Sequence, residues 1–356
     1  MTTSVGIRGL GLYLPDEVRR NDFWPPDVTG AWMQRRPQRP AVPPEHELTD
    51  GARRILEAQA RQAADPFQGT VERRIMPTGM SLLDMEERAA RVALDRAGVA
   101  VDQIDLLLTN QTVPDVLLGN PACALHERLG LPAACLSMHT DVATHAFMMQ
   151  LELAEGMILA GRARFAMLVQ SCAPSRLVDV KDPNAPFFGD AATATIVGPV
   201  THGRGLAASA HFTDGRFPKT LIATVPGARW YDAGRVLLHV GDPVQMQRVF
   251  LSTADACRTA IEAALAKSAR DAMDVDFVGI HQGQPWLRQV VQEYAGLAHA
   301  RSIDSFRETG YLFASTIPAA LALAEDRGLL RPDDLVVLTG GGPGMTYGAA
   351  VMTWGV

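Results

Sequence analysis

Short apolar stretches alternate with amphipathic stretches along most of the chain. The first apolar stretch covers residues 5–14 and stops at Pro15. From residue 81 onward the alternation is regular, with apolar stretches of strand length between stretches that have the helical period. The predicted helices are 81–97, 121–129 and 144–160, and the predicted strands are 105–109, 135–138, 165–169 and 192–197. Helices that alternate with buried strands indicate an α/β fold.

Residues 22–70 differ from the rest of the chain because they hold many prolines and many charges. They contain one helical pattern, 49–64, for which Thr49 or Asp50 is a suitable N-cap. We interpret 22–70 as a surface insertion or a lid. The alternative is an excursion that takes no part in any site, and the sequence leaves both open.

The second half of the chain repeats the pattern of the first. Residues 276–282 follow a predicted helix, 253–269, and align without a gap with residues 105–111, with Asp first and Gln last in both segments. Later, residues 335–339 resemble 165–169, and each stretch is followed by a glycine-containing turn and a final strand. The final strands are 192–197 and 348–353. Chance likeness of short apolar strands is the alternative to a duplication.

The repeat predicts two βα halves, residues 1–200 and residues 201–356, with a period far longer than that of a solenoid repeat. The strands of each half are too apolar to be left uncovered. Two such halves are therefore expected to pack as a layered α/β/α/β/α body.

Composition narrows the class of protein. The 356 residues are 47% hydrophobic and 20% charged, as in soluble globular proteins. A net charge of −6 argues against a nucleic-acid-binding protein. The four cysteines lack metal-binding or disulfide spacing, so we expect no metal site. The N-terminal residues lack the signal-peptide pattern and no apolar stretch is long enough for a membrane helix, so we expect a cytoplasmic protein without membrane contact.

A dense polar cluster, MHTDVATHAF at 138–147, lies where the helix 144–160 is predicted to begin. It holds two His, two Thr and one Asp, but no Cys and no Ser. Such a density of polar side chains is typical of an active site. The cluster therefore raises the question of whether it provides a nucleophile.

Six further segments carry a resemblance that runs over nearly the whole chain outside 22–70. They are GLYLPDEVRRND (11–22), VERRIM (71–76), FFGDAATATIVG (187–198), HQGQPWL (281–287), GYLFASTIP (310–318) and GGGPGMTYGA (340–349). In this order and spacing they resemble the thiolase superfamily, and within it the β-ketoacyl-acyl-carrier-protein synthase III branch. The resemblance implies a thiolase fold, a homodimer, a pantetheine tunnel, and acyl-CoA or acyl-carrier-protein substrates, with no cofactor beyond the CoA or phosphopantetheine of the substrate. It does not fix the reaction, because one fold hosts many functions.

The family uses a Cys nucleophile at a helix N-terminus, where backbone N–H groups and the helix dipole lower the thiol pKa. In the family this Cys lies three residues before the Phe that opens the helix. Here that Phe is Phe147, so the position belongs to Thr144. Cys135 follows two alanines, as in the family's nucleophile tripeptide, but it lies in the preceding strand. We interpret Cys135 as a core residue and Thr144 as either the nucleophile or a helix N-cap.

The other family positions are altered as well. The family's His is retained as His281, whereas its Asn is replaced by Tyr311. The glycine loop of the family donates one backbone N–H to the oxyanion. The alignment puts Pro343, which has no N–H, at this position. A slip of one residue would restore the donor as Gly342 or Gly344.

These changes argue against ordinary decarboxylative condensation. That reaction needs a thiolate, two neutral donors for the enolate and an oxyanion hole, and a Thr hydroxyl is a weak nucleophile without an adjacent base. What remains is base chemistry by His281. We predict an acyltransferase of specialised metabolism that moves an acyl group to a hydroxyl or amine, either through Thr144 or directly to the acceptor. Tyr311 would donate to the oxyanion or orient His281.

Two other functions stay open. The altered positions also fit a non-catalytic, ketosynthase-like partner or scaffold subunit with a degenerate site. The third hypothesis is an atypical β-ketoacyl synthase. An intact His281 and an ordered GYLFASTIP segment favour an enzyme over a scaffold.

The other polar residues of the cluster 138–147 are expected to support the site rather than to react. Helix period and strand alternation direct His145 away from Thr144, so it is expected to face an interface. His139 is expected in the core or behind the site. Asp141 is expected to form a turn rather than to pair with either His.

Substrate contacts are suggested by analogy. Trp32 and Arg36 suit the tunnel mouth, where an aromatic ring stacks on adenine and Arg pairs with phosphate; a solvated basic loop is the alternative. The loop 111–120 is expected to enter the acyl pocket of the partner subunit, so that Leu117 and Leu118 shape it. Two further predicted substrate-binding residues lie in the matching motifs and are Gln284 and Phe313.

Overall fold

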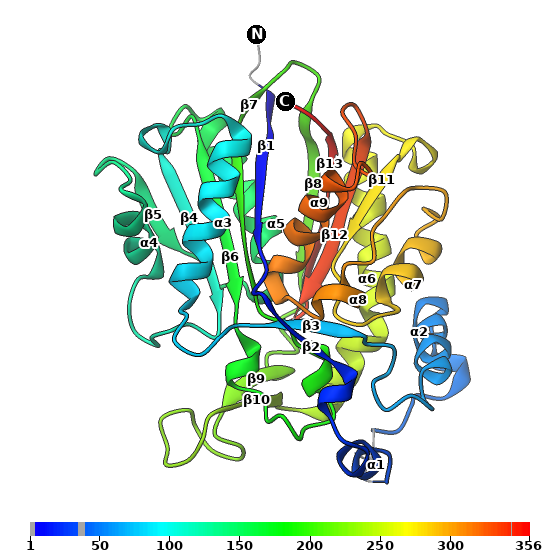
Figure 1. The fold of residues 1–356 in the computed structure, drawn as a ribbon. Helices are drawn as coiled ribbons and strands as arrows, with labels where there is room; N and C mark the ends of the chain where they lie inside the picture. The colour runs from blue at the N-terminus through cyan, green and yellow to red at the C-terminus, as the bar shows by residue number, and fades with distance from the viewer. Residues whose placement is uncertain (1–3, 35–39, 343) are drawn as a thin grey trace.

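The computed structural model describes residues 4–34, 40–342 and 344–356. Two mixed β-sheets lie face to face with helices between them and on both outer faces (Figure 1). The first sheet has the strand order β1-β7-β6-β4-β5 and the second has the order β11-β12-β13-β8. The strands of the two sheets are β1 (Ser4–Tyr13), β4 (Leu106–Thr112), β5 (Leu136–His139), β6 (Ala166–Cys172), β7 (Ala191–Val200), β8 (Gly205–Thr213), β11 (Phe277–Ile280), β12 (Leu335–Gly342) and β13 (Thr346–Thr353).

The helices complete five layers. Helices α3 and α4 cover the outer face of the first sheet, α5 and α9 lie between the sheets, and α6 and α7 cover the second sheet (Figure 1). The helices are α1 (Pro26–Gln34), α2 (Asp50–Arg61), α3 (Leu82–Ala97), α4 (Pro121–Leu129), α5 (Ala146–Leu159), α6 (Pro243–Ser268), α7 (Leu287–Tyr294), α8 (Phe306–Thr309) and α9 (Thr316–Asp326). This α/β/α/β/α arrangement is the one that the sequence predicts.

The two sheets share a topology. In the first, β4 and β6 are parallel, β6 and β7 are antiparallel, and β7 and β1 are antiparallel. In the second, β11 and β12 are parallel, β12 and β13 are antiparallel, and β13 and β8 are antiparallel. The strand pairs that the sequence comparison matched therefore occupy equivalent places in the two sheets.

Local signals explain where several helices begin and end. Ser81 caps α3 in a capping box with Asp84, and Gly98 in the left-handed conformation closes the helix. The predicted start of the long second-half helix at Thr253 is wrong. Helix α6 begins at Pro243 with Asp242 as its N-cap, because Asp followed by Pro is a helix start signal.

Three apolar clusters fill the spaces between the layers. One lies between the two sheets around α5 and α9, and the others lie beneath α3 and α4 and beneath α6 and α7. Cys135, 6% exposed, belongs to the cluster beneath α3 and α4, which confirms its interpretation as a core residue. Burial raises the pKa of its thiol, so Cys135 is not an activated nucleophile.

Three segments lie outside the layers. Residues 22–70 contain α1 and α2, and α2 packs against α6 and α7. The other two are antiparallel pairs, β2 (Glu17–Arg20) with β3 (Glu72–Ile75) and β9 (Leu221–Thr224) with β10 (Leu237–Val240). In Figure 1 they lie below the sheets, at the end opposite to the chain termini.

Candidate active site

Four segments meet where the parallel strands end. A 3-10 turn, Ala143–His145, leads into α5, and His281 directly follows β11. Tyr311 precedes a second 3-10 turn, Phe313–Ser315, which leads into α9, and Gly342 ends β12. Residues at the carboxyl ends of parallel strands and at helix N-termini converge on one edge of such a layered body, which is a common place for a ligand site.

Thr144 lies against the glycine loop. It is 4% exposed, and its Oγ1 donates a hydrogen bond to the carbonyl oxygen of Gly341, 3.2 Å away. The N-cap residue of α5 is His145, and no side chain caps the helix end there. The alternative that Thr144 caps the helix is therefore wrong, because its hydroxyl is bonded to a loop that lies 197 residues further along the chain.

Tyr311 is the second hydroxyl of the site. The Thr144 side chain lies beside its hydroxyl, and the Tyr311 ring stacks on Phe313 with centroids 4.4 Å apart. Burial raises the pKa of the phenol well above its ordinary value, so Tyr311 keeps its proton at neutral pH. The phenol is therefore a hydrogen-bond donor and not an anion.

His281 packs edge-on against Tyr311, with ring centroids 5.4 Å apart and an interplanar angle of 83°. The residue is 6% exposed, and no hydrogen bond joins its ring nitrogens to the described residues. Burial lowers the pKa of the imidazole to about 4, because desolvation disfavours the charged form. His281 is thus neutral at physiological pH and has a ring nitrogen able to take a proton.

The glycine loop approaches Thr144 closely. A Cβ at Gly342 would stand 1.7 Å from Oγ1 of Thr144, so any larger residue would have to displace the Thr144 side chain. Gly344 adopts a φ of +79° with open space around it. Pro343, the residue aligned with the family's oxyanion donor, lies outside the described residues.

Backbone strain accompanies the site residues. Ala143 precedes Thr144 with a φ of 46°, and Phe313, with a φ of 51°, follows Tyr311 by two residues. Met345 in the glycine loop has a φ of 53°. Positive φ values at residues other than glycine are costly and gather at functional sites, so the outliers support this assignment.

The other histidine next to Thr144 has a different place from the one predicted. His145 is 1% exposed, and its Nε2 is hydrogen-bonded with Nδ1 of His211 at 3.0 Å. The expectation that it faces an interface is wrong, because β8 and β13 cover it. Burial, with smaller contributions from His211 and His281, lowers the pKa of His145 to about 3. Glu152 lies 3.7 Å from the outer nitrogen of His211.

The remaining polar residues of 138–147 are structural. Asp141 accepts a hydrogen bond from the backbone N–H of Ala143, which confirms the predicted turn. His139 shares a hydrogen bond with the Thr109 hydroxyl through Nδ1, at 3.1 Å. Neither residue is among those that line the cavity described next.

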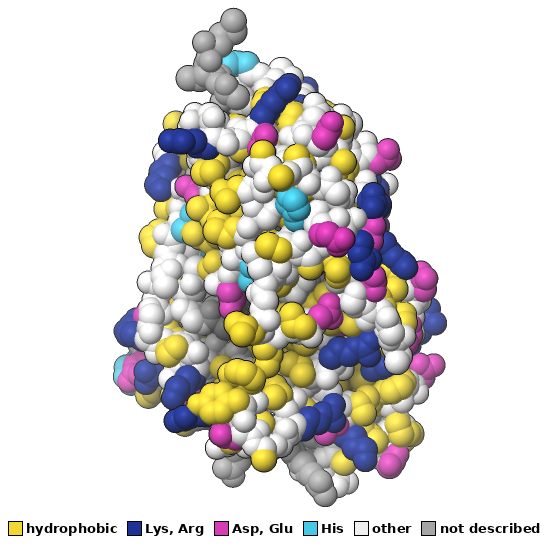
Figure 2. All heavy atoms as spheres, turned by 90° about the vertical axis from the view of Figure 1, so that its left-hand side faces the viewer, with side chains coloured by type: hydrophobic (Ala, Val, Ile, Leu, Met, Phe, Trp, Pro, Cys, Tyr) yellow, Lys and Arg dark blue, Asp and Glu magenta, His cyan; other side chains and the backbone are white. Residues whose placement is uncertain are grey.

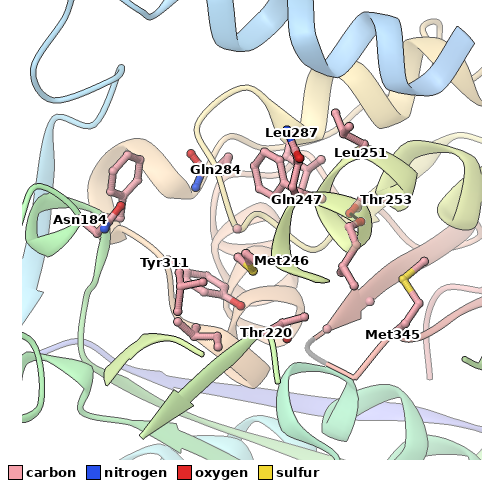
Figure 3. Close-up of a pocket in the computed structure, with 18 of the residues that line it drawn as sticks. Asn184, Thr220, Met246, Gln247, Leu251, Thr253, Gln284, Leu287, Tyr311 and Met345 are labelled. Atoms are coloured by element: carbon pink, nitrogen blue, oxygen red, sulfur yellow. Dashed lines mark hydrogen bonds between the residues drawn. The ribbon is translucent and has the colours of Figure 1, made fainter. Parts of the chain in front are cut away.

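A cavity of about 570 Å³ opens in front of these residues (Figure 3). His281, Tyr311 and Gly342 line one part of it, and α6 and the β9–β10 hairpin line the rest. Four described residues of the 22–70 segment also face it, namely Pro40, Val42, Leu56 and Gln59. Residues of 22–70 therefore form part of the cavity wall, and a role as a lid stays a prediction.

The predicted substrate contacts have different outcomes. Gln284 lines the cavity, whereas Phe313 lies behind the Tyr311 ring and supports it. Trp32 does not present a stacking surface, because its ring is 7% exposed and its Nε1 donates to the carbonyl of Lys181. Arg36 lies outside the described residues.

Leu117 and Leu118 do not line the cavity of their own chain. Leu117 is 68% exposed and Leu118 is 97% exposed, on the loop that follows β4. Their predicted place in the acyl pocket of a partner subunit stays a prediction.

Several cavity residues were not identified from the sequence. Thr220 and His239 come from the β9–β10 region and Gln247 from the first turns of α6. The Asp242-Pro243 signal would have extended α6 over Gln247, but no sequence signal marks Thr220 or His239. Of the four cysteines, Cys257 lines the cavity. Burial raises the pKa of its thiol to about 11, so it remains protonated and a poor nucleophile.

Two features are absent from the described residues. No group of His, Cys, Asp and Glu side chains in these parts of the chain is arranged to hold a metal ion. No described helix has both the length and the apolar character needed to span a membrane.

Known proteins of one family resemble this chain. The family 3-Oxoacyl-[acyl-carrier-protein (ACP)] synthase III matches residues 138–215, and its C-terminal part matches residues 265–354. The β-ketoacyl-(acyl-carrier-protein) synthase III of Geobacillus kaustophilus is 30% identical over 353 residues, covering 98% of this chain and 99% of that protein.

Two solved structures have the same fold. The 3-oxoacyl-(acyl carrier protein) synthase III of Pseudomonas aeruginosa has a TM-score of 0.78 at 24% identity, with 99% of each chain covered. The priming β-ketosynthase of a polyketide biosynthetic pathway has a TM-score of 0.80 at 20% identity, covering 99% of this chain and 97% of that one. At these identities the likeness is one of fold.

Proposed function

The chain belongs to the 3-oxoacyl-(acyl-carrier-protein) synthase III family, and from this premise we propose that it is an acyltransferase of specialised metabolism. It moves an acyl group from a CoA or carrier-protein thioester to a hydroxyl or amine. His281 is the general base, Tyr311 donates to the oxyanion, and Thr144 occupies the family's nucleophile position.

One observation carries this proposal. The neutral imidazole of His281 and the protonated phenol of Tyr311 line the same cavity, whereas the Thr144 hydroxyl donates to the carbonyl oxygen of Gly341. A hydroxyl nucleophile needs an adjacent base to take its proton. The proton of Thr144 is directed to a carbonyl oxygen and not to His281. This supports direct transfer to the acceptor rather than an acyl-threonine intermediate.

The reaction then has two steps. The acceptor oxygen or nitrogen attacks the thioester carbonyl carbon while His281 takes its proton, and the carbonyl oxygen becomes an oxyanion that accepts a hydrogen bond from Tyr311. The C–S bond then breaks, and the leaving thiolate takes the proton from His281. The products are an ester or amide and a free thiol, and both side chains return to their starting states.

Carbon–carbon condensation is less well supported by the same residues. Transfer to carbon would need a thiolate that holds the acyl group while a second thioester is decarboxylated. Thr144 offers a hydroxyl at that position, and the thiol of Cys257, with a pKa raised to about 11, is not ionised at neutral pH. Ester or amide formation needs neither.

We further propose a homodimer. Strand β5 lies at the edge of the first sheet, and its Leu136 and Met138 are 53% and 41% exposed. The nearby loop exposes Val116, Leu117 and Leu118. Figure 2 shows apolar side chains spread over the face on which β5 lies. An unpaired edge strand flanked by apolar side chains is a suitable surface for pairing with a second copy.

The experiment combines octanoyl-CoA, or octanoyl-N-acetylcysteamine, with 1-octanol or octylamine. Ester or amide is measured by mass spectrometry, and the mass of the intact protein is measured in parallel. We expect product from the unaltered chain and no acyl adduct on it. Product should be lost in His281→Ala but retained in Thr144→Ala. The exposed His46 provides the control, His46→Ala, which should behave as the unaltered chain.

Other outcomes separate the alternatives. An acyl adduct that disappears in Thr144→Ala would replace direct transfer by a covalent route. A β-ketoacyl product from added malonyl thioester would indicate a condensing enzyme. Absence of product with every pair, together with tight binding to a homologous active synthase, would overturn the enzyme proposal in favour of a scaffold.

A further inference from the structure

The character of the cavity restricts what it can bind. Its volume of about 570 Å³ lies in the range of sites for small molecules. Figure 3 shows Tyr311, Thr220 and Met345 on one side of the cavity and Leu251 and Leu287 on the other. Leu251 and Leu287 belong to α6 and α7, the helices against which α2 packs. The cavity therefore extends from the reacting groups to the inserted segment.

Charge is scarce along the walls. Among the described residues that line the cavity there is no Lys and no Arg, and Asp182 is the single carboxylate. A phosphate or carboxylate drawn into this space would meet no cation among the described lining residues and would face Asp182. This part of the wall therefore disfavours an anionic ligand.

The side-chain hydroxyl of Thr220 indicates where a ligand binds. Thr220 is 1% exposed and lines the cavity, yet its Oγ1 has no hydrogen-bond partner among the described residues. Buried hydroxyls are nearly always bonded, so an orphan that faces a cavity indicates a group supplied from outside. The Gln284 side-chain amide also lines the cavity and forms no hydrogen bond with the described residues. Both offer uncharged donors and acceptors.

The apolar wall near the insertion is held in place. Gln247 donates from its amide to the carbonyl of Pro40 at 2.9 Å. The Asp255 carboxylate on α6 accepts from Thr49, at the start of α2, at 2.6 Å and from Tyr294 at 2.8 Å. Residues 40–59 are thus tied to α6, and Val42 and Leu56 form a fixed apolar surface. A wall that is already ordered binds an apolar group without an ordering cost.

We infer that this cavity binds an uncharged molecule with a bulky apolar body and a hydroxyl or carbonyl group. Thr220 and Gln284 hold the polar group, and Val42 and Leu56 contact the apolar body. Under the proposed function, on which this assignment rests, the molecule is the acyl acceptor. An uncharged pantetheine arm shares part of this chemistry, so the test distinguishes the two sources.

The test uses two fluorescent probes that share one ring system. N-phenyl-1-naphthylamine is uncharged, and 8-anilinonaphthalene-1-sulfonate adds a sulfonate to it. We expect the uncharged probe to bind at least about 10-fold more tightly. Leu56→Arg should weaken its binding by at least about 10-fold and strengthen binding of the sulfonate. Val42→Arg, at a half-exposed position, should act in the same direction if Leu56→Arg does not fold. Val92→Arg, on the outer face of α3, is the control.

Thr220 is tested with a ligand that has a hydroxyl. The affinity for 2-(1-naphthyl)ethanol, measured by displacement of the uncharged probe, should fall roughly 5-fold in Thr220→Val and stay unchanged in Thr220→Ser. The probe itself, which lacks the hydroxyl, should bind Thr220→Val as before. Equal weakening of both ligands would overturn the assignment of Thr220.

Two results would overturn the inference as a whole. One is equal or tighter binding of the sulfonated probe. The other is a probe that D-pantetheine displaces completely and whose binding does not change in Leu56→Arg. That result would show that the cavity binds the pantetheine arm of the donor. Binding needs no turnover. If the protein binds the uncharged probe selectively but forms no ester, the binding site is supported and acyl transfer is overturned. If it forms ester but does not prefer the uncharged probe, acyl transfer is supported and the binding site is overturned.

Discussion

Gly342 and Thr144 are packed so closely that a methyl group on Gly342 would stand 1.7 Å from the Thr144 hydroxyl oxygen. The same methyl group would be 3.0 Å from the Thr144 Cβ. The glycine loop at the end of β12 thus fixes the turn before α5 through contact with a side chain that lies far away in the sequence.

Gly342→Ala is expected to destabilise the protein by about 1–3 kcal/mol, because the new methyl group must displace the Thr144 side chain. Thr144→Ala in the same chain should recover part of this loss, since it removes the oxygen but leaves a tight Cβ contact. Urea unfolding of the two single variants and the double variant measures the coupling. Gly156→Ala, where added atoms meet open space, is the control. Additive effects at 342 and 144 would contradict the contact.

Tyr311→Phe is expected to lower kcat of acyl transfer by about 10²–10³-fold, because it removes the donor proposed for the oxyanion. The KM for the donor should change little, since the ring and its stacking on Phe313 remain. Steady-state kinetics with octanoyl-CoA and 1-octanol measures both constants. Tyr347→Phe, at another cavity-lining phenol, is the matched control. A rise in KM at constant kcat would assign the Tyr311 hydroxyl to binding instead.

The pH dependence of catalysis follows from His281. As a base it must be unprotonated, and burial lowers its pKa to about 4. We therefore expect kcat/KM to be constant from about pH 8 to pH 6 and to fall toward half its value near pH 4. Stopped assays with brief exposure to each pH measure this profile. A midpoint near the ordinary histidine value of about 6.5 would show that His281 is solvated or is not the base.

Acid should also destabilise the fold. Burial lowers the pKa of His145 to about 3 and that of His281 to about 4, so both are neutral in the folded chain. Below about pH 6.5 these histidines bind protons in the unfolded chain but not in the folded chain. The free energy of unfolding therefore decreases as the pH falls from about 6.5 toward 4. Thermal melts of His145→Gln should show a shallower fall in Tm between pH 7 and 4.5 than the unaltered chain.

The amide of the introduced Gln can still donate a hydrogen bond to His211. The variant therefore removes the titrating imidazole at position 145 while keeping a hydrogen-bond donor there. His46→Gln changes a side chain that is 81% exposed and serves as the control. A slope in His145→Gln identical to that of the unaltered chain would mean that His145 is not buried as a neutral imidazole.

Met138→Lys is expected to convert the proposed dimer into a monomer, because a charge would be placed on the open edge of β5. Sedimentation velocity at several protein concentrations measures the state. Met273→Lys replaces a methionine that is 69% exposed and lies away from β5, so it should leave the dimer intact. A monomer in the unaltered chain at all concentrations would exclude β5 as a pairing edge.

Much of the site could be predicted from the sequence because the signals are local. The register from Phe147 identifies Thr144, and motifs beside strands and helices identify His281 and Tyr311. Gln284 was found in the same way. Arg36 and Trp32 rested on a weaker analogy within the insertion, and the burial of Trp32 depends on Trp24 and Phe67, which no spacing rule connects to it.

By itself the sequence determined the alternation of strands and helices, the duplication of the two halves and the residue at each position proposed for catalysis, since periodicity and motif spacing are properties of neighbouring residues. Only the tertiary structure decided which contacts those residues make. It directs the Thr144 proton to Gly341 across 197 residues and buries His145 against His211 across 66. It also brings the insertion to the cavity wall. Hydrogen bonding and desolvation depend on which distant segments pack together, and that is set by the fold as a whole.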